Sequence, residues 1–437
     1  MSATETLRSA HAFAFDPFHA PDDVDPHTPL RRARRERPVF YSVALGTWVV
    51  TRHADVMAVL RDPGRFSSIH AVTNKPAPPP PEILAILGRG IPYEPNSVDL
   101  DPPRHTKFRG LINRAFMPRR ISAMEPAIVR LAHAAIDGFA AAGEVDLVQH
   151  FAYPLPARVI ADLLGIPAAD LDAFKRWSDE WMILLGQIGD LPRLERAAEA
   201  VVEFQHYIAG LIAARRRERG DDLVGDVVAA VADDPDPPSD NSLVGLLMTV
   251  LFAGHETTTS MITNTVRLLL QHPEALAQVR GDARLVPAAI VEALRFEPPV
   301  PSMYRTTTAE ARVGGVTLPA GEHLQLSFVA ANRDEARFAE PDRFDLHRAD
   351  KVNHLAFGQG IHACVGAALA QLEGRVAVQA LLERLPGLRL VAGQTIEPVV
   401  SATVRGTRRL MLAWDPVGPV VHAPRADVDH EGLQAST

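Results

Sequence analysis

The stretch Phe357-Gly358-Gln359-Gly360-Ile361-His362-Ala363-Cys364-Val365-Gly366 carries the single cysteine of this 437-residue chain. An apolar run precedes it and a helical pattern begins at Val365, so the thiol is expected where a loop becomes a helix. The unpaired N–H groups and partial positive charge of a helix N-terminus favour the thiolate. Gly358 and Gly360 allow a flat ligand to lie close to the loop. The pattern indicates a soft metal ligand, and the alternative is a buried structural cysteine.

The pattern Phe-x-x-Gly-x-x-x-Cys resembles the haem-ligand loop of the cytochromes P-450. In that family the cysteine thiolate is an axial ligand of the haem iron and promotes O–O cleavage. The resemblance implies a mainly α fold with a smaller β region, and haem b held between a long central helix and the cysteine loop. The residues that it places around the haem in this loop are Phe357, Gly358, Gly360, His362, Cys364 and Gly366.

The longest helical pattern covers residues 241–271 and would span roughly 46 Å. In its middle, Ala253-Gly254-His255-Glu256-Thr257-Thr258-Thr259 is poor in helix-forming residues. Asp240 and Asn241 are predicted to cap its start. The run matches the signature [Ala/Gly]-Gly-x-[Asp/Glu]-Thr of the family's distal helix. The resemblance implies that Thr257 helps to deliver protons to bound dioxygen and that Glu256 connects this site to solvent.

Further segments match the family in order and spacing. Glu292 and Arg295 lie one helical turn apart, and the resemblance implies that they brace the haem-binding core together with Arg343. A buried haem also needs cationic side chains for its two propionates. The resemblance assigns these to His105, Arg109, Arg305 and His362. Its substrate pocket would be lined by Val250, Ala253, Gly254, Val300 and Met303.

Composition bounds the remaining possibilities. Apolar residues make up 47% of the chain and charged residues 22%, which are ordinary values for a globular protein. The balance of 45 basic against 53 acidic residues argues against nucleic acid as a partner. One cysteine excludes internal disulfides. Because neither a signal peptide nor an apolar run of membrane-spanning length is visible, we expect a cytoplasmic monomer without membrane contact.

The pattern along the chain predicts one large domain. We expect an irregular N-terminal segment over 1–35, a single cytochrome P-450 domain over 36–415 and a disordered tail over 416–437. Strands are predicted at 39–43, 47–51, 324–328 and 409–414. The proline-rich stretch 71–100 is expected to be irregular and to cover the substrate pocket. Helices are predicted at 104–116, 120–140, 157–164, 169–186, 192–217, 221–232, 241–271, 273–280 and 286–296.

The resemblance implies a monooxygenase that inserts one oxygen atom from O2 into a hydrophobic small molecule, by hydroxylation or epoxidation. A terpenoid, fatty acid, steroid or polyketide-like substrate is compatible with it. The chain has no dinucleotide motif and no flavin or iron–sulfur ligand set. Electrons from NAD(P)H would therefore come through a ferredoxin or flavodoxin with its reductase. A basic stripe that could steer such an acidic partner contains Arg104, Lys107, Arg114, Arg119 and Arg120.

Two alternatives stay open from the sequence. A peroxide-driven peroxygenase tends to lack the acid–alcohol pair, so the presence of Glu256 and Thr257 argues against it. A non-catalytic haem sensor or recruitment module would be favoured by loss of Cys364 or Thr257, and both are present.

Overall fold

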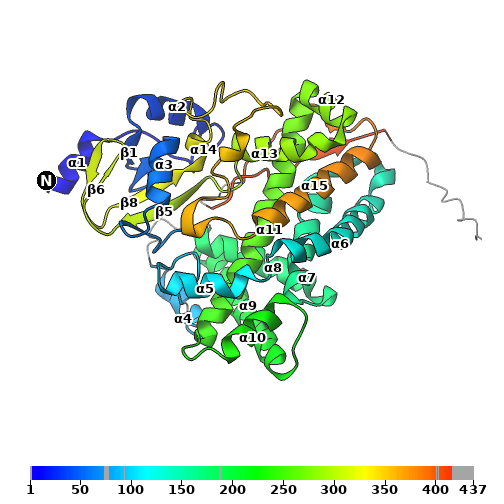
Figure 1. Cartoon of the computed structure of the whole chain (residues 1–437), viewed down its shortest axis with the longest axis horizontal. Coiled ribbons are helices and arrows are strands. Elements are labelled where there is room, and N and C mark those ends of the chain that lie inside the picture. Colours follow the sequence, from blue (N-terminus) through cyan, green and yellow to red (C-terminus); the bar gives the residue numbers. More distant parts are fainter. Residues whose placement is uncertain are drawn as a thin grey trace, which may run out of the picture.

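The computed structural model describes residues 2–72, 78–92, 94–186, 189–399, 401 and 403–415. The predicted tail over 416–437 lies outside these ranges. The chain is mainly helical with a smaller β region, as the sequence predicts (Figure 1). The α-helices are α1 (Ala3–Ala10), α2 (His27–Glu36), α3 (His53–Leu60), α4 (Pro81–Leu87), α5 (Arg104–Asn113), α6 (Pro118–Asp137), α7 (Pro154–Leu164), α8 (Leu171–Gly186), α9 (Leu191–Arg217), α10 (Leu223–Ala232), α11 (Asp240–Gln271), α12 (Pro273–Gly281), α13 (Val286–Phe296), α14 (Phe328–Ala331) and α15 (Ala367–Arg384).

The strands form a five-stranded sheet in the order β1-β2-β8-β5-β3, a three-stranded sheet in the order β4-β10-β9, and the β6–β7 hairpin. In the large sheet, β1 and β2 form the predicted antiparallel hairpin, with Val39 opposite Val50. Strand β8 then pairs with β2 in parallel. Their bounds are β1 (Val39–Ser42), β2 (Thr47–Val50), β3 (Phe66–Ser67), β4 (Glu144–Asp146), β5 (Ser302–Thr307), β6 (Ala311–Val313), β7 (Val316–Leu318), β8 (His323–Ser327), β9 (Arg389–Leu390) and β10 (Met411–Ala413).

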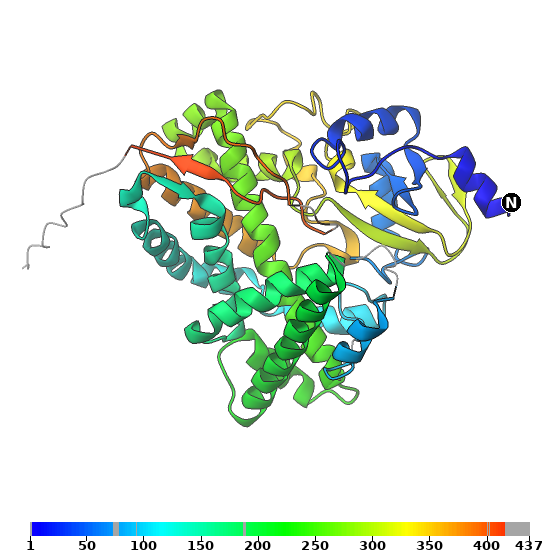
Figure 2. The same cartoon turned by 180° about the vertical axis from the view of Figure 1, so that it is seen from behind.

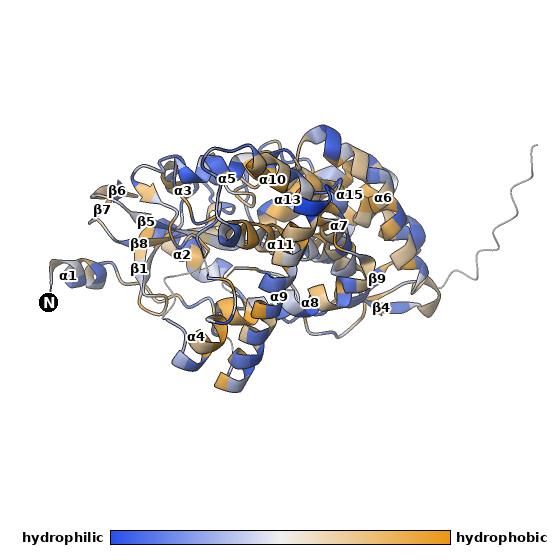
Figure 3. Cartoon of the chain, turned by 90° about the horizontal axis from the view of Figure 1, so that it is seen from below, coloured by the Kyte–Doolittle hydropathy of each residue, from blue (hydrophilic) through white to orange (hydrophobic). Residues whose placement is uncertain are grey.

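Helix α11 runs through the centre of the helical part, and the large sheet with α1 to α3 lies to one side of it (Figures 1 and 2). It packs against α7, α9, α13 and α15. Its residues are apolar on most sides, including Leu246, Leu251 and Ile262 in the main core cluster. The outer helices instead mix hydrophilic with hydrophobic residues (Figure 3). The helix is capped by Ser239, whose side chain accepts from the N–H of Ser242. The predicted caps Asp240 and Asn241 are already inside it.

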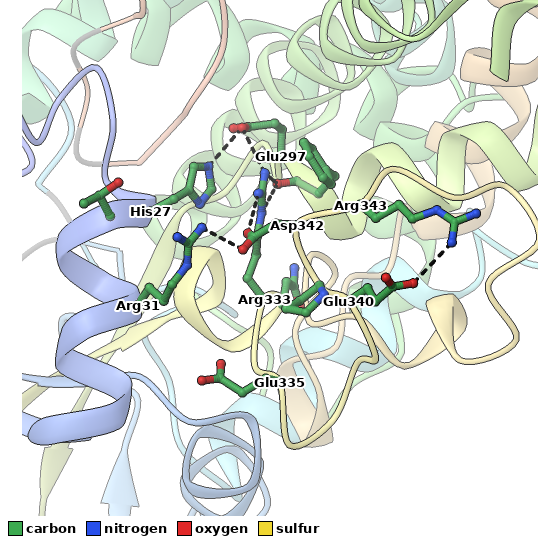
Figure 4. A network of polar contacts seen from close by, with 12 residues as sticks. His27, Arg31, Glu297, Arg333, Glu335, Glu340, Asp342 and Arg343 are labelled. Atoms are coloured by element: carbon green, nitrogen blue, oxygen red, sulfur yellow. Dashed lines mark hydrogen bonds and ion pairs between the residues drawn. The ribbon is translucent and has the colours of Figure 1, made fainter. Parts of the chain in front are cut away.

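The segment 1–35, predicted to be irregular, contains α1 and most of α2. Helix α2 is held from outside the segment, which a local sequence pattern does not reveal. Its Leu30 and Ala33 are buried in a cluster with Phe40 and Val49 of the sheet. Figure 4 shows His27 from this helix pointing to Glu297, with Nε2 and Oε1 3.0 Å apart. The N-terminal segment therefore packs against the rest of the domain.

The proline-rich stretch is also more regular than predicted, because α4 begins at Pro81. Proline suits the first turn of a helix, where its missing N–H has no intrahelical acceptor in any case. Ile83 of this helix is fully buried against Leu194 and Ala198 of α9. Packing on α9 thus stabilises a short helix that propensity alone would not.

Candidate active site

Two glycines with positive φ shape the loop before α15. Gly358 has a φ of 64° and Gly360 a φ of 73°, values that favour glycine. A Cβ on Gly360 would collide with the carbonyl oxygen of Leu60, so the loop lies directly on the end of α3. The N–H of Cys364 donates to the carbonyl of Phe357 at 2.8 Å and closes the loop.

Cys364 lies two residues before Gly366, the N-cap of α15. Its side chain has accessible surface, yet burial within the protein raises the pKa of the thiol. The N–H groups of Gly366 and Ala367 and the guanidinium of Arg109 lower this pKa by less than burial raises it. The predicted effect of the helix N-terminus is therefore present, but burial outweighs it. A metal cation bound to the sulfur would reverse the balance, because coordination deprotonates a thiol outright.

The four basic side chains predicted to hold the haem propionates come together. The rings of His105 and His362 lie 4.3 Å apart between centroids. His362 Nε2 also lies 2.8 Å from the hydroxyl of Ser68. Burial, together with the nearby Arg305, His105 and Arg109, lowers the pKa of His362 to about 3. Their mutual repulsion shows that these groups share one small region.

This basic cluster has few partners within the protein. Arg305 is 3% exposed, and its Nη1 donates to the carbonyl of Tyr304 at 2.6 Å. Burial lowers the pKa of Arg305 to about 10. In the described part of the chain, neither Arg305 nor Arg109 forms an ion pair with a carboxylate, and the buried Nε2 of His105 has no hydrogen-bond partner. Buried cations require anions, so this donor set fits the two carboxylates of a haem.

The predicted oxygen-side residues lie in the middle of α11. Ala253 is exposed there, although Phe252 and His255 beside it are buried. One turn later, the hydroxyl of Thr257 donates to the carbonyl of Ala253 at 2.9 Å and stays accessible. Thr258 makes the same type of bond to the preceding turn at 3.0 Å but is only 2% exposed. Of these two hydroxyls, that of Thr257 is the one open to a ligand.

The other predicted pocket residues are placed as follows. A Cβ on Gly254 would lie 2.7 Å from Ile160 Cδ1. This glycine therefore permits close packing of α11 on α7, and its predicted contact with haem or substrate stays a prediction. Val250 is 9% exposed and belongs to the main core. Val300 and Met303 are partly buried against the cluster of the large sheet, and their contact with a substrate stays a prediction.

Glu256 does not project freely into solvent. Its carboxylate Oε1 lies 3.2 Å from Nε2 of His255, and the side chain is 18% exposed. Burial raises the pKa of Glu256, but the hydrogen bond and charge of His255, with the charge of Lys175, outweigh burial and lower it. The sequence motif contained His255 between Gly254 and Glu256, yet nothing in its spacing indicated this contact.

Glu292 and Arg295 form a fully buried pair with two bonds, from Nε to Oε2 at 2.8 Å and from Nη2 to Oε1 at 2.7 Å. The third partner was predicted to be Arg343, and this is wrong. Arg343 is exposed, and its side chain pairs with Glu340 at the surface (Figure 4). The third guanidinium belongs to Arg348, whose Nε lies 3.3 Å from Glu292 Oε1 in the interior. Arg343 contributes only its carbonyl oxygen, which accepts from Arg295 and Arg348.

A separate small pocket lies between the N-terminal segment and the large sheet. Phe15, Phe18, Val329 and Arg405 are among its lining residues. Neither Cys364 nor any residue of the basic cluster lines it, so it is distinct from the site described above.

Within the described ranges, no helix combines the length and the apolar character needed to cross a bilayer.

The chain is similar to known proteins in sequence and in fold. The family model described as Cytochrome P450 matches residues 96–387. The chain is 38% identical to cytochrome P450 107B1 of Saccharopolyspora erythraea, over 91% of this chain and 96% of that protein. It is also 38% identical to the mycinamicin IV hydroxylase/epoxidase of Micromonospora griseorubida, over 87% and 92% of the two chains. The crystal structure of the CYP116B5 haem domain of Acinetobacter radioresistens superposes with a TM-score of 0.88 at 30% identity, covering 95% of this chain and all of that one.

Family match and fold agree, and membership of this family implies that the reaction uses haem iron and O2. The chain belongs to the cytochrome P450 family and is a monooxygenase of the type found in these bacterial relatives.

Proposed function

We propose that this protein hydroxylates or epoxidises a hydrophobic small molecule, with haem b held by Cys364 and with electrons supplied by a separate redox protein. The observation that carries the proposal is the basic cluster of His105, Arg109, Arg305 and His362, which lies near the one cysteine. His105 and Arg305 are buried, and in the described part of the chain none of the four side chains forms an ion pair with a carboxylate. Haem, when bound, supplies oxygen activation at an iron with a thiolate ligand.

The chain's own residues would then hold and orient the haem and supply protons. The basic cluster orients the propionate edge, and the loop closed by the bond from Cys364 to Phe357 presents the sulfur. The accessible hydroxyl of Thr257 holds a proton at Oγ1 in the middle of α11. Glu256, ionised and partly exposed, links this part of the helix to solvent.

Electrons are proposed to pass from NAD(P)H through a reductase and a ferredoxin or flavodoxin. Two of the five residues of the predicted basic stripe pair with acidic side chains in the structure. Lys107 pairs with Asp234 and Asp236, and Arg120 pairs with Asp226, so both are neutralised by neighbours. Arg104, Arg114 and Arg119 remain exposed. The last two flank Phe116, whose ring lies 3.7 Å from the position of a Cβ on Gly366. They therefore lie beside the Cys364 loop, where an acidic partner would favour electron transfer.

The substrate is proposed to be a secondary metabolite, either polyketide-like or of another hydrophobic class. The name of the Micromonospora griseorubida relative, mycinamicin IV hydroxylase/epoxidase, supports this class and both reaction types. A screen of candidate compounds for a substrate-induced change in the haem spectrum would identify ligands without requiring the natural redox partner.

Replacement of Thr257 by Ala tests the oxygen-activating role. Haem content and substrate-induced spectral change should stay near normal, because alanine is the better helix former. Product formed per NAD(P)H consumed should fall by roughly 10²- to 10⁴-fold, the range of general acid catalysis, while release of hydrogen peroxide rises.

Thr258→Ala is the matched control, since it removes a hydroxyl with the same backbone bond from a buried position. It should leave the ratio of product to NAD(P)H close to that of the wild type. Equal ratios in the Thr257→Ala variant and the wild type would refute the role of Thr257.

A further inference from the structure

The hydroxyl hydrogen of Thr249 on α11 finds no acceptor in the described part of the chain. A threonine in a helix usually donates to the carbonyl one turn earlier. Threonines of α11 that do so are Thr257, Thr258, Thr263 and Thr265. The hydroxyl of Thr249 makes no such bond to Gly245, which the structure also describes; its Oγ1 accepts from Nδ2 of Asn96 at 3.0 Å instead. Thr259 also lacks the bond, but its oxygen is buried out of reach of a ligand.

The backbone fixes which end of the Asn96 amide faces Thr249. Oδ1 of Asn96 accepts from the N–H of Val98 at 3.3 Å, so the NH2 group is directed to Thr249. An NH2 group only donates, so it occupies a lone pair of the Thr249 oxygen and the hydroxyl hydrogen points elsewhere. Asn96 is 4% exposed, whereas Thr249 is partly exposed. The hydroxyl is therefore presented as a donor to a ligand.

The accessible positions of α11 place this hydroxyl on the side of the helix that carries Thr257. Between residues 242 and 252, the positions that are not buried are Gly245 and Thr249. Ala253 and Thr257 continue the series at intervals of four residues, and side chains at this spacing are neighbours on a helix. Thr249 and Thr257 are eight residues apart, which corresponds to roughly 12 Å along the helix axis.

The segment 94–101 follows this side of α11 and then reaches the basic cluster. The carbonyl oxygen of Glu94 lies 3.6 Å from the position of a Cβ on Gly245, one turn before Thr249. At the other end of the segment, Asp101 accepts from the N–H of Ser68 at 2.8 Å, and the hydroxyl of Ser68 contacts His362. The bond from Asn96 to Thr249 is made by the middle of a segment that joins the start of α11 to the predicted propionate site.

We propose that Thr249 donates a hydrogen bond to an acceptor oxygen of the substrate and that Asn96 positions its hydroxyl for this bond. The substrate class is a hydrophobic molecule with a ketone, ester or ether oxygen roughly 12 Å from the carbon that is oxidised beside Thr257. A few placed polar groups in a mainly apolar site fix the orientation of a ligand. This inference rests on the proposed monooxygenase function and narrows its substrate.

The test compares two probes of the same shape on the holoprotein, by titration of the change that each causes in the haem spectrum. Methyl decyl ketone has one acceptor oxygen near the end of a long apolar chain. In the matched alkene, a methylene group replaces that oxygen. The wild type should bind the ketone roughly 3- to 10-fold more tightly than the alkene, the range expected for one net hydrogen bond. Oxidation of the ketone should occur in the part of the chain remote from the oxygen.

Three variants separate the donor from its support. Thr249→Val removes the hydroxyl with little change of volume and should abolish the preference for the ketone, whereas Thr249→Ser should retain it. Asn96→Asp should also abolish it although Thr249 is intact, because an ionised carboxylate only accepts and the hydroxyl would donate to it. Bonds from Thr249 and from the N–H of Val98 favour the ionised form. A purely structural role of Asn96 would weaken the binding of both probes alike.

Thr263→Val is the matched control on the same helix. It makes the same chemical change at a hydroxyl that is 1% exposed and already donates to the carbonyl of Thr259 at 2.8 Å. The ratio of the two dissociation constants should stay that of the wild type. Because the preference is a ratio within each variant, a general loss of haem or stability does not imitate the expected effect.

Equal binding of the two probes by the wild type, failure of the ketone to bind included, would overturn the inference. A preference for the ketone that survives in Thr249→Val would also overturn it. These failures are distinct from failure of the proposed function, because binding is read without turnover. If Thr257→Ala uncouples the reaction but no preference exists, the monooxygenase role stands without this contact. If the preference depends on Thr249 while Thr257→Ala keeps full coupling, the contact stands and the role of Thr257 fails.

Discussion

Cys364 shows how the ionisation of a single residue would depend on a bound metal. Its loop is preformed by Gly358, Gly360 and the bond to Phe357, but burial raises the pKa of the thiol. Ionisation of this sulfur is therefore coupled to metal binding.

Replacement of Cys364 by Ala removes the one thiol of the chain. The reduced protein with bound CO should lose the absorption typical of a thiolate ligand, because no second cysteine can take its place. Absorption spectra of the reduced CO complexes of variant and wild type check this. A thiolate-type spectrum in the variant would contradict the assignment of Cys364 as ligand.

Arg348 and Arg343 provide a matched pair at the same scale. Arg348→Leu leaves the buried Glu292 with one cation fewer and should lower the free energy of unfolding by about 3–5 kcal/mol. Arg343→Leu removes an exposed ion pair and should change it by less than about 1 kcal/mol. Denaturant unfolding and haem content of the two variants distinguish them. Equal losses of unfolding free energy in the two variants would mean that Arg343 stabilises the buried pair as much as Arg348 does.

At the scale of elements, the contact between α11 and α7 depends on one missing side chain. Gly254→Ala places a Cβ 2.7 Å from Ile160. Although alanine favours helix, we expect destabilisation by about 1–3 kcal/mol from overpacking. Gly245→Ala, on the same helix, brings its Cβ no closer than 3.6 Å to the carbonyl of Glu94. It should instead stabilise the protein by up to about 1 kcal/mol. Thermal unfolding of both variants is the measurement, and stabilisation by both would show that α7 can move away.

For the whole molecule, the buried carboxylate of Glu297 joins segments far apart in sequence. It lies 3.0 Å from His27 and 3.4 Å from Arg333 (Figure 4). It also lies 3.3 Å from Arg405. Burial raises the pKa of Glu297, but these partners hold it well below 4.5. Its stabilising contribution is thus present above the unfolded-state pKa and is lost as the pH falls through the folded-state pKa.

Glu297→Gln should therefore lower the free energy of unfolding by about 3–5 kcal/mol at neutral pH, because Arg405 loses its carboxylate partner and the buried Arg333 keeps only Asp342. This difference from the wild type should shrink as the pH falls below about 4.5. Urea unfolding over a pH series measures it. Glu340→Gln, at an exposed pair, serves as control and should have little effect at any pH. A pH-independent difference for Glu297→Gln would show that the carboxylate is not ionised in the folded protein.

The sequence by itself determined the class of fold and most helix positions, and it predicted which loop holds the haem ligand. The helices predicted at 192–217 and 286–296 are found at 191–217 and 286–296, because caps, prolines and apolar periodicity indicate their ends. The order and spacing of Cys364, Thr257, His105 and Arg305 indicate the family by themselves. These features are encoded locally or in linear order, so a sequence displays them directly.

Only the tertiary structure decided which distant groups meet. Arg348 rather than Arg343 reaches Glu292 because the chain turns its side chain inward. Gly254 leaves room for the side chain of Ile160 on α7, and α4 depends on burial of Ile83 against α9. The contact of His255 with Ser178 likewise joins α11 to α8. Each of these contacts depends on the distance and direction between side chains from separate segments, which local periodicity does not specify.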